Sequence, residues 1–195
     1  GVFSMMNGGI VTGQELVKHP KVKAVGFTGS LRGGRALFDL ANQRPEPIPV
    51  YAEMGSTNPS FLMPEKLVAD PEGLGNIFAN SVALGVGQFC TSPGLLIGVK
   101  SLALDKFIET LSQAFAGKDA VTMLNKKIAT SYYTHRGVLI EQTGVDTLGD
   151  TNNPGENKGK PLTAKVDGKT FLSNPKLHEE IFGPFTLVVA CEDAA

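Results

Sequence analysis

Apolar residues in this chain alternate between short β-branched runs and longer stretches of helical spacing. Residues 22–27 form such a run, and a Thr-Gly-Ser turn follows at residues 28–30. Beyond the turn, apolar side chains recur at helical spacing, namely Leu37, Phe38, Leu40 and Ala41. Because serine is a preferred N-cap, Ser30 is expected to begin this helix. The pattern predicts a strand, a turn and a helix.

The alternation continues along the chain. A second strand is expected at residues 48–54, after a proline-rich connection, and a helix at residues 74–84. Gly85 and Gly87 should end that helix, since glycine readily adopts the left-handed cap conformation. Residues 95–99 read as a buried strand.

An amphipathic helix is predicted at residues 102–115, with one apolar face made of Leu104, Phe107, Ile108, Leu111 and Phe115. Residues 186–190 are again strand-like, whereas residues 150–160 are polar and rich in Gly and Asn, which predicts an exposed excursion. Alternating strands and helices indicate an α/β fold with a largely parallel sheet.

Composition limits the classes of partner. The chain has 195 residues with 42% hydrophobic and 19% charged, enough to bury a core in one or two domains. The net charge is −1 and the chain has no cluster of basic residues, which argues against nucleic-acid binding. No apolar run approaches the length needed to cross a membrane, and no basic segment of a signal peptide precedes the first residues. These features predict a cytoplasmic protein without a membrane partner.

The chain has two cysteines, Cys90 and Cys191, and both are expected to remain free thiols because no secretory signal accompanies them. The three histidines are scattered, so no metal site is predicted. Cys191 lies at the end of an apolar run and is expected to be structural. Cys90 instead follows a glycine-terminated helix and precedes the turn residues 91–94, where a small molecule can approach it.

Three other segments have a functional and a simpler interpretation. A strand that turns through Gly29 into a helix favours a bound phosphate, although an ordinary packed turn has the same sequence. Glu53, at the end of the second strand, can be a base for thiol chemistry or a solvated strand end. Glu180 and Phe182 can be a ligand site, or a surface carboxylate beside a core aromatic residue.

Four segments, in this order, resemble the aldehyde dehydrogenase superfamily: Phe-Thr-Gly-Ser at 27–30, Glu-Met-Gly at 53–55, Gly-Gln-Phe-Cys-Thr at 87–91 and Glu-Glu-Ile-Phe-Gly-Pro at 179–184. Members of this superfamily oxidise aldehydes to acids with NAD(P)⁺ through a covalent cysteine adduct. The resemblance implies that Cys90 attacks the aldehyde, that its backbone N–H holds the oxyanion, and that Glu53 activates the hydrolytic water.

The same resemblance implies a site for NADP or NAD. Ser30 would lie against the pyrophosphate, with Gly29 as the packing residue, and Gly55 belongs to the matched Glu-x-Gly segment. Glu180 would bind the nicotinamide ribose, since a carboxylate can accept two hydrogen bonds from vicinal hydroxyls, and Phe182 would border the nicotinamide.

In fold terms, residues 1–55 are expected to be the C-terminal part of a Rossmann-like dinucleotide-binding domain, and residues 56–195 most of the catalytic domain. The resemblance places the first nucleotide-binding strands upstream and an oligomerisation strand downstream of this chain. The 195-residue chain alone is therefore expected to be inactive, and the parent protein to be a homodimer or homotetramer.

Residues 50–64 most resemble the branch that oxidises α-ketoglutaric semialdehyde to 2-oxoglutarate, with Ser56 standing where most relatives have glycine. Fatty and other aliphatic aldehyde dehydrogenases are the alternative. A silent structural protein with this fold and an acylating enzyme that transfers the thioester to coenzyme A are two further alternatives. The presence of Cys90, Glu53 and Glu180 argues against the silent protein, and Glu53 as a water-activating base favours hydrolysis over transfer to coenzyme A.

Overall fold

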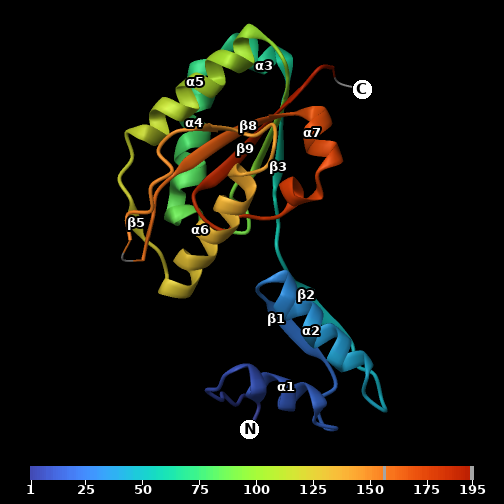
Figure 1. The fold of residues 1–195 in the computed structure, drawn as a ribbon. Coiled ribbons are helices and arrows are strands. Elements are labelled where there is room, and N and C mark those ends of the chain that lie inside the picture. The colour runs from blue at the N-terminus through green and yellow to red at the C-terminus, as the bar shows by residue number, and fades with distance from the viewer. Residues whose placement is uncertain (156, 194–195) are drawn as a thin grey trace. The chain divides into compact units, whose positions relative to one another are not determined.

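The computed structural model describes residues 1–155 and 157–193. The chain divides into two compact units, residues 1–55 and 56–195, each of which has its own sheet. Figure 1 shows the helices and strands of each unit.

The first unit is a small α/β layer. Its elements are α1 (Ile10–Lys18), β1 (Val25–Thr28), α2 (Leu31–Asn42) and β2 (Val50–Glu53). The two strands run parallel, and the buried apolar residues between the strands and helices are Val17, Val25, Ala41 and Ile48. Arg44 is also buried, and its guanidinium donates to the carbonyls of Val17 at 2.8 Å and Val22 at 3.0 Å.

The start of α2 confirms the predicted cap. The Ser30 hydroxyl accepts a hydrogen bond from the Gly33 N–H at 3.2 Å, which satisfies one donor of the first turn. Both strands are shorter than residues 22–27 and 48–54, the predicted ranges. The reason is that only Val25–Thr28 and Val50–Glu53 face each other in the ladder.

The second unit contains a five-stranded sheet in the order β3-β4-β9-β8-β6. All neighbouring pairs are parallel except β6 with β8. The largely parallel α/β sheet expected from the sequence is confirmed. The strands are β3 (Pro59–Leu62), β4 (Leu95–Val99), β9 (Phe185–Cys191), β8 (Leu162–Asp167) and β6 (Asp146–Leu148).

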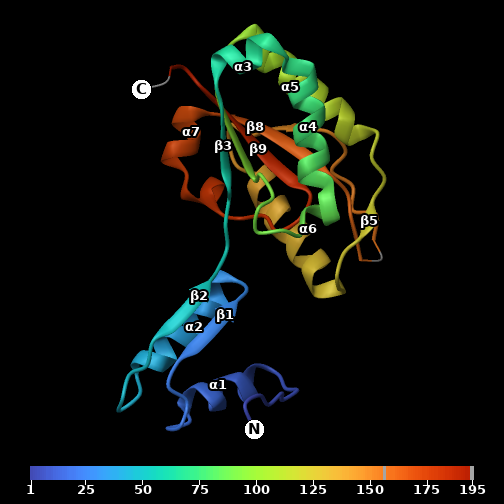
Figure 2. The same ribbon diagram turned by 180° about the vertical axis from the view of Figure 1, so that it is seen from behind.

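Helices cover both faces of this sheet (Figures 1 and 2). One face packs against α3 (Pro64–Ala69), α4 (Pro71–Ala83) and α5 (Leu102–Ala116). The other packs against α6 (Lys126–Ile140) and α7 (Gly168–Ser173). Two short 3-10 helices, η1 (Leu84–Gly87) and η2 (Pro175–His178), and a two-stranded ribbon of β5 (Val121–Thr122) with β7 (Lys158–Gly159) complete the unit.

Helix α5 follows the sequence prediction closely. Ser101 caps its N-terminus through a hydrogen bond from the Leu104 N–H, and the five residues of the predicted apolar face are all buried. Phe107 also meets Phe78 of α4 in an edge-to-face contact with ring centroids 5.9 Å apart. Burial of each such side chain contributes about 1.5–3 kcal/mol, so this face fixes α5 on the sheet.

Two expectations need correction, and one long helix was not expected. Helix α4 begins at Pro71 rather than residue 74, because Asp70 caps it by accepting from the Gly73 N–H at 2.9 Å. The segment 150–160 is not wholly exposed, since Lys158–Gly159 forms β7 and Gly159 is buried; Glu156 lies outside the described residues. Helix α6 was not predicted, since its buried face includes polar side chains that weaken the apolar pattern.

Candidate functional site

Three loops meet at one edge of the second unit's sheet. Parallel strands all begin at the same edge, so the segments that precede β3, β4 and β9 lie together there. The Gly94 N–H donates to the Thr57 carbonyl at 3.0 Å, and the Leu187 N–H donates to the Gly94 carbonyl at 2.9 Å. The Asn58 side-chain amide also donates to the Thr91 carbonyl. These bonds join the segment before β3 to the loop that carries Cys90.

The turn after α4 has an unusual backbone. Gly85, Val86 and Gly87 have φ of 54°, 58° and 64°. The left-handed glycines are as predicted, whereas Val86 is a β-branched residue in a conformation that such residues rarely adopt. At Gly87 a side chain has no room, because an added Cβ would lie 2.2 Å from the carbonyl carbon and oxygen of Gly183. The loop of Cys90 thus packs directly on the loop that follows Glu180.

Cys90 is a free, exposed thiol outside any helix or strand, as expected from its flanking residues. Gln88 anchors the same loop: its Nε2 donates to the Gly85 carbonyl at 3.0 Å, and its Oε1 accepts from the Leu124 N–H at 2.9 Å. Cys191 is also free and partly buried. It ends β9 beside Val99, so the length of β4 separates the two thiols.

Glu180 is partly buried at the same edge. Burial raises the pKa of the Glu180 carboxyl group, and a hydrogen bond from the Ser56 backbone N–H opposes this increase in the pKa. One backbone donor leaves lone pairs on the carboxylate free to accept further bonds. The carboxylate can therefore accept hydrogen bonds from a ligand's hydroxyl groups.

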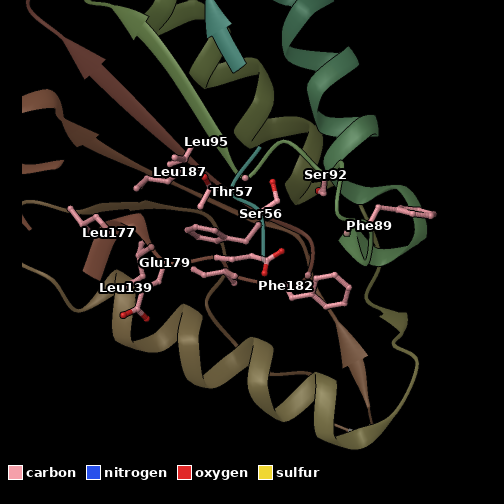
Figure 3. A pocket seen from close by; sticks show the side chains of 16 residues that line it. Ser56, Thr57, Phe89, Ser92, Leu95, Leu139, Leu177, Glu179, Phe182 and Leu187 are labelled. Carbon is pink, nitrogen blue, oxygen red and sulfur yellow. The ribbon is translucent and has the colours of Figure 1, made fainter. Parts of the chain in front are cut away.

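A small pocket of about 20 Å³ lies among these loops (Figure 3). Its lining includes Ser56, Thr57, Phe89, Ser92, Glu180 and Phe182. Cys90 is not among the lining residues. A volume of this size holds little more than one water molecule, so the pocket by itself does not enclose an aldehyde.

The first unit presents its motif residues at the carboxyl ends of β1 and β2. Gly29 follows β1, and its N–H donates to the Glu53 carbonyl at 3.0 Å. An added Cβ on Gly29 would lie 2.7 Å from the Phe27 ring, which agrees with a packing role. Ser30 begins α2, whose first N–H groups have no partner within the helix and suit a phosphate.

Glu53 and Gly55 follow at the end of β2, and both are exposed. The structure therefore brings Gly29, Ser30, Glu53 and Gly55 to the carboxyl ends of β1 and β2. In the second unit, Glu180 and Phe182 line one pocket, whereas Cys90 lies outside its lining, on the loop that packs against Gly183.

Sequence reasoning did not find the contacts that hold Glu180 and the Cys90 loop. The Ser56 backbone N–H on Glu180 and the Gln88 contact with Leu124 join distant parts of the chain, so no local pattern indicates them. The hydrogen bond from the Asn58 side chain to the Thr91 carbonyl also joins distant parts of the chain and was not expected.

Across residues 1–155 and 157–193, no cluster of three His, Cys, Asp or Glu side chains is arranged to hold a metal ion. Within the same described residues, no helix is long and apolar enough to span a membrane.

Known proteins with similar sequences match the whole chain. It is 46% identical over 199 residues to alpha-ketoglutaric semialdehyde dehydrogenase 2 of Azospirillum brasilense, covering 99% of this chain and 37% of that protein. It is 42% identical over 197 residues to alpha-ketoglutaric semialdehyde dehydrogenase of Acinetobacter baylyi, covering 100% of this chain and 37% of that protein. The chain thus spans little more than a third of the length of these relatives.

Solved structures share the fold at lower identity. An aldehyde dehydrogenase from Pseudomonas aeruginosa superposes with a TM-score of 0.75 at 22% identity, over 93% of this chain and 38% of that one. An NAD-dependent benzaldehyde dehydrogenase from Corynebacterium glutamicum gives a TM-score of 0.76 at 23% identity, over 96% of this chain and 41% of that one. The model of the aldehyde dehydrogenase family matches residues 1–195, and the chain belongs to that family.

Proposed function

We propose that the polypeptide carrying this chain oxidises an aldehyde to a carboxylic acid with NAD⁺ or NADP⁺, and that Cys90 is the nucleophile. The observation that carries this proposal is the placement of Cys90. It is an exposed thiol on an irregular loop that packs, through Gly87, on the loop following Glu180. Membership of the aldehyde dehydrogenase family supports the reaction class.

The proposed chemistry uses few groups of this chain. The Cys90 thiolate attacks the aldehyde carbon, and the backbone N–H of Cys90 donates to the resulting oxyanion. When bound, NAD(P)⁺ would supply the acceptor for a hydride from that carbon, and loss of the hydride would leave a thioester on Cys90. A water then loses a proton to Glu53 and attacks the thioester, releasing the acid and the free thiol.

The cofactor contacts are proposed from residues whose geometry suits them. Ser30 and the unpaired N–H groups at the start of α2 suit the pyrophosphate, and Gly29 lets the chain turn closely against Phe27. Gly55 lies just after the carboxyl end of β2, in the same unit. Glu180 would accept from the ribose hydroxyls, and Phe182, which lines the same pocket, would border the nicotinamide.

For the substrate we propose α-ketoglutaric semialdehyde, because the two relatives described above, at 46% and 42% identity, are named for it. A fatty or other aliphatic aldehyde is the alternative, and a catalytically silent protein of the same fold is a further one. A homodimeric or homotetrameric state and a cytoplasmic location stay predictions from the sequence.

The test is formation of reduced cofactor by the full-length polypeptide that carries residues 1–195. Wild type, Cys90→Ser and Cys191→Ser would each be assayed with α-ketoglutaric semialdehyde or a medium-chain aldehyde, and with NAD⁺ or NADP⁺. We expect activity in wild type and Cys191→Ser, and its loss in Cys90→Ser. A folded wild type that reduces neither cofactor with either aldehyde would favour the silent protein.

Two additions separate the remaining alternatives. Product analysis with and without coenzyme A tells hydrolysis from acyl transfer, because an acylating enzyme forms the coenzyme A thioester. Assay of the 195-residue chain alone tests the expectation that it has little turnover. NAD(P)H formation that depends on Cys90 in this short chain would contradict that expectation.

A further inference from the structure

Helix α6 places a buried tyrosine behind the two loops of the candidate site. Tyr132 is 1% exposed, and no motif of the sequence singles it out. Its ring lies against Gly183, where an added Cβ would approach the ring carbon Cδ2 to 2.3 Å. Gly183 also contacts Gly87, because an added Cβ on Gly87 would lie 2.2 Å from the Gly183 carbonyl. Tyr132, Gly183 and Gly87 thus form a continuous stack.

The Tyr132 hydroxyl is fixed by backbone carbonyl groups. It lies 2.7 Å from the Lys160 carbonyl oxygen and 3.3 Å from that of Pro184, and its single hydrogen is best placed on the shorter contact. Burial raises the pKa of the Tyr132 hydroxyl, so the group remains a donor throughout the ordinary pH range. The ring position is therefore set by a polar contact as well as by packing.

Arg136, one helical turn further along α6, donates to the Tyr132 hydroxyl at 3.5 Å. It is 2% exposed, and its guanidinium donates to the Thr151 carbonyl at 2.6 Å. The guanidinium carbon also lies 5.3 Å from the ring centre of Tyr132 and 4.5 Å from that of Tyr133. These contacts leave Tyr132 little freedom to move away from Gly183.

We propose that Tyr132 is a positioning residue that sets the spacing between the Cys90 loop and the Glu180–Phe182 segment. It touches neither Cys90 nor Glu180 in the contacts described above, and acts through the backbone of Gly183 and Gly87. The consequence for catalysis rests on the proposed function, whereas the consequence for loop order does not.

The first test measures loop order by amide hydrogen exchange in the full-length polypeptide. Tyr132→Leu removes the ring and hydroxyl, Tyr132→Phe removes the hydroxyl alone, and Tyr133→Phe is the matched control. Tyr133 is the adjacent residue, and its hydroxyl accepts from the Lys160 N–H at 3.2 Å. The three atoms nearest to an added Cβ on Gly183, however, all belong to Tyr132.

We expect Tyr132→Leu to speed exchange about fivefold or more in both segments 85–91 and 179–185, with α5 unchanged. Tyr132→Phe should give a smaller increase in both, and Tyr133→Phe none. Faster exchange in segment 179–185 alone, or an equal increase in α5, would overturn the proposal. The first result would show that the two loops are not coupled, and the second that the protein is destabilised as a whole.

A second test uses the contact itself. Gly183→Ala should disturb both segments, because its Cβ collides with the ring, and the added Tyr132→Ala substitution should relieve part of that disturbance. If the double variant shows the sum of the two separate effects on exchange, the ring contact does not couple the loops.

The kinetic test separates positioning from stability. We expect Tyr132→Leu to raise the KM for NAD(P)⁺ about fivefold or more and to lower kcat, because Glu180 and Cys90 are both displaced. A variant that only unfolds in part loses kcat without a change in KM, and that outcome would contradict the proposal. If wild type has no activity, the proposed function fails, but the exchange experiments still decide the role of Tyr132.

Discussion

The Ser56 backbone N–H donates to the Glu180 carboxylate across the loops that precede β3 and β9. Burial nevertheless raises the pKa of the Glu180 carboxyl group, so loss of water outweighs the one hydrogen bond. The folded structure therefore holds the side chain in place but disfavours its ionised form, as is common at ligand-binding sites.

Because the pKa of Glu180 is raised on folding, the stability of the second unit depends on pH. Since the pKa is higher in the folded state than in the unfolded one, the folded protein binds more protons, and stability falls as pH rises from the unfolded pKa through the folded pKa. We expect Glu180→Gln, which removes the charge, to be more stable than wild type at pH 7. The difference should shrink at pH 4, where the carboxyl group is protonated more fully in both states.

Urea unfolding of both proteins at the two pH values measures this difference. The same substitution should raise the KM for NAD(P)⁺ if Glu180 binds the ribose. An equal stability difference at both pH values would show that packing, rather than ionisation, distinguishes the variant from wild type.

The two thiols should differ in reactivity. Cys90 is exposed on a loop, whereas Cys191 ends a strand and lies 3.2 Å from the Cβ position of Gly168. We expect an alkylating reagent to modify Cys90 about tenfold faster than Cys191 in the native protein, and at a similar rate in urea. Mass spectrometry of the two peptides over time gives both rates, and equal native rates would count against Cys90 as the nucleophile.

Gly87→Ala should be strongly destabilising. The position combines φ of 64° with an added Cβ 2.2 Å from the backbone of Gly183, so both backbone strain and overpacking oppose alanine. Together they should lower the free energy of unfolding by about 2–4 kcal/mol. Gly137→Ala in α6 is the control, because that Cβ meets no atom within 4 Å.

Alanine at Gly137 should raise the free energy of unfolding by about 0.5–1 kcal/mol, since glycine is a poor helix former. Denaturant titration of the two variants beside wild type measures both changes. If Gly87→Ala is as stable as wild type, the close packing of the two loops described above is wrong.

Ser30 offers a way to separate capping from cofactor binding. Ser30→Ala loses the acceptor for the Gly33 N–H and should cost about 1 kcal/mol of stability. Ser30→Asp keeps an acceptor at the helix start but adds a negative charge where we propose the pyrophosphate. It should retain stability and weaken binding of NAD(P)⁺.

Unfolding by urea and cofactor titration of the two variants give the two quantities. If Ser30→Asp binds the cofactor as well as wild type does, the pyrophosphate does not lie against this residue.

Local patterns in the sequence determined much of the fold. The apolar face of α5 and the bounds of β4 follow from side-chain spacing, and Ser30 was identified as a cap from its residue type. These features depend on neighbours within a few residues, so the sequence indicates them without knowledge of the rest of the chain. Helix α6 was not predicted, because its buried face includes Tyr132 and Arg136, which interrupt the apolar pattern. Their polar groups form hydrogen bonds with residues far along the chain.

The candidate site was predicted as separate motifs, and only the tertiary structure decided which of their atoms meet. Spacing places Cys90 in a loop, but it does not indicate that Gly87 packs on Gly183 or that the Ser56 N–H faces Glu180. Those contacts depend on the strand order β3-β4-β9, which brings to one edge of the sheet residues that are 96 apart in the chain, Gly87 and Gly183, and 124 apart, Ser56 and Glu180. Strand order is set by the packing of all the layers together, and no short stretch of sequence contains it.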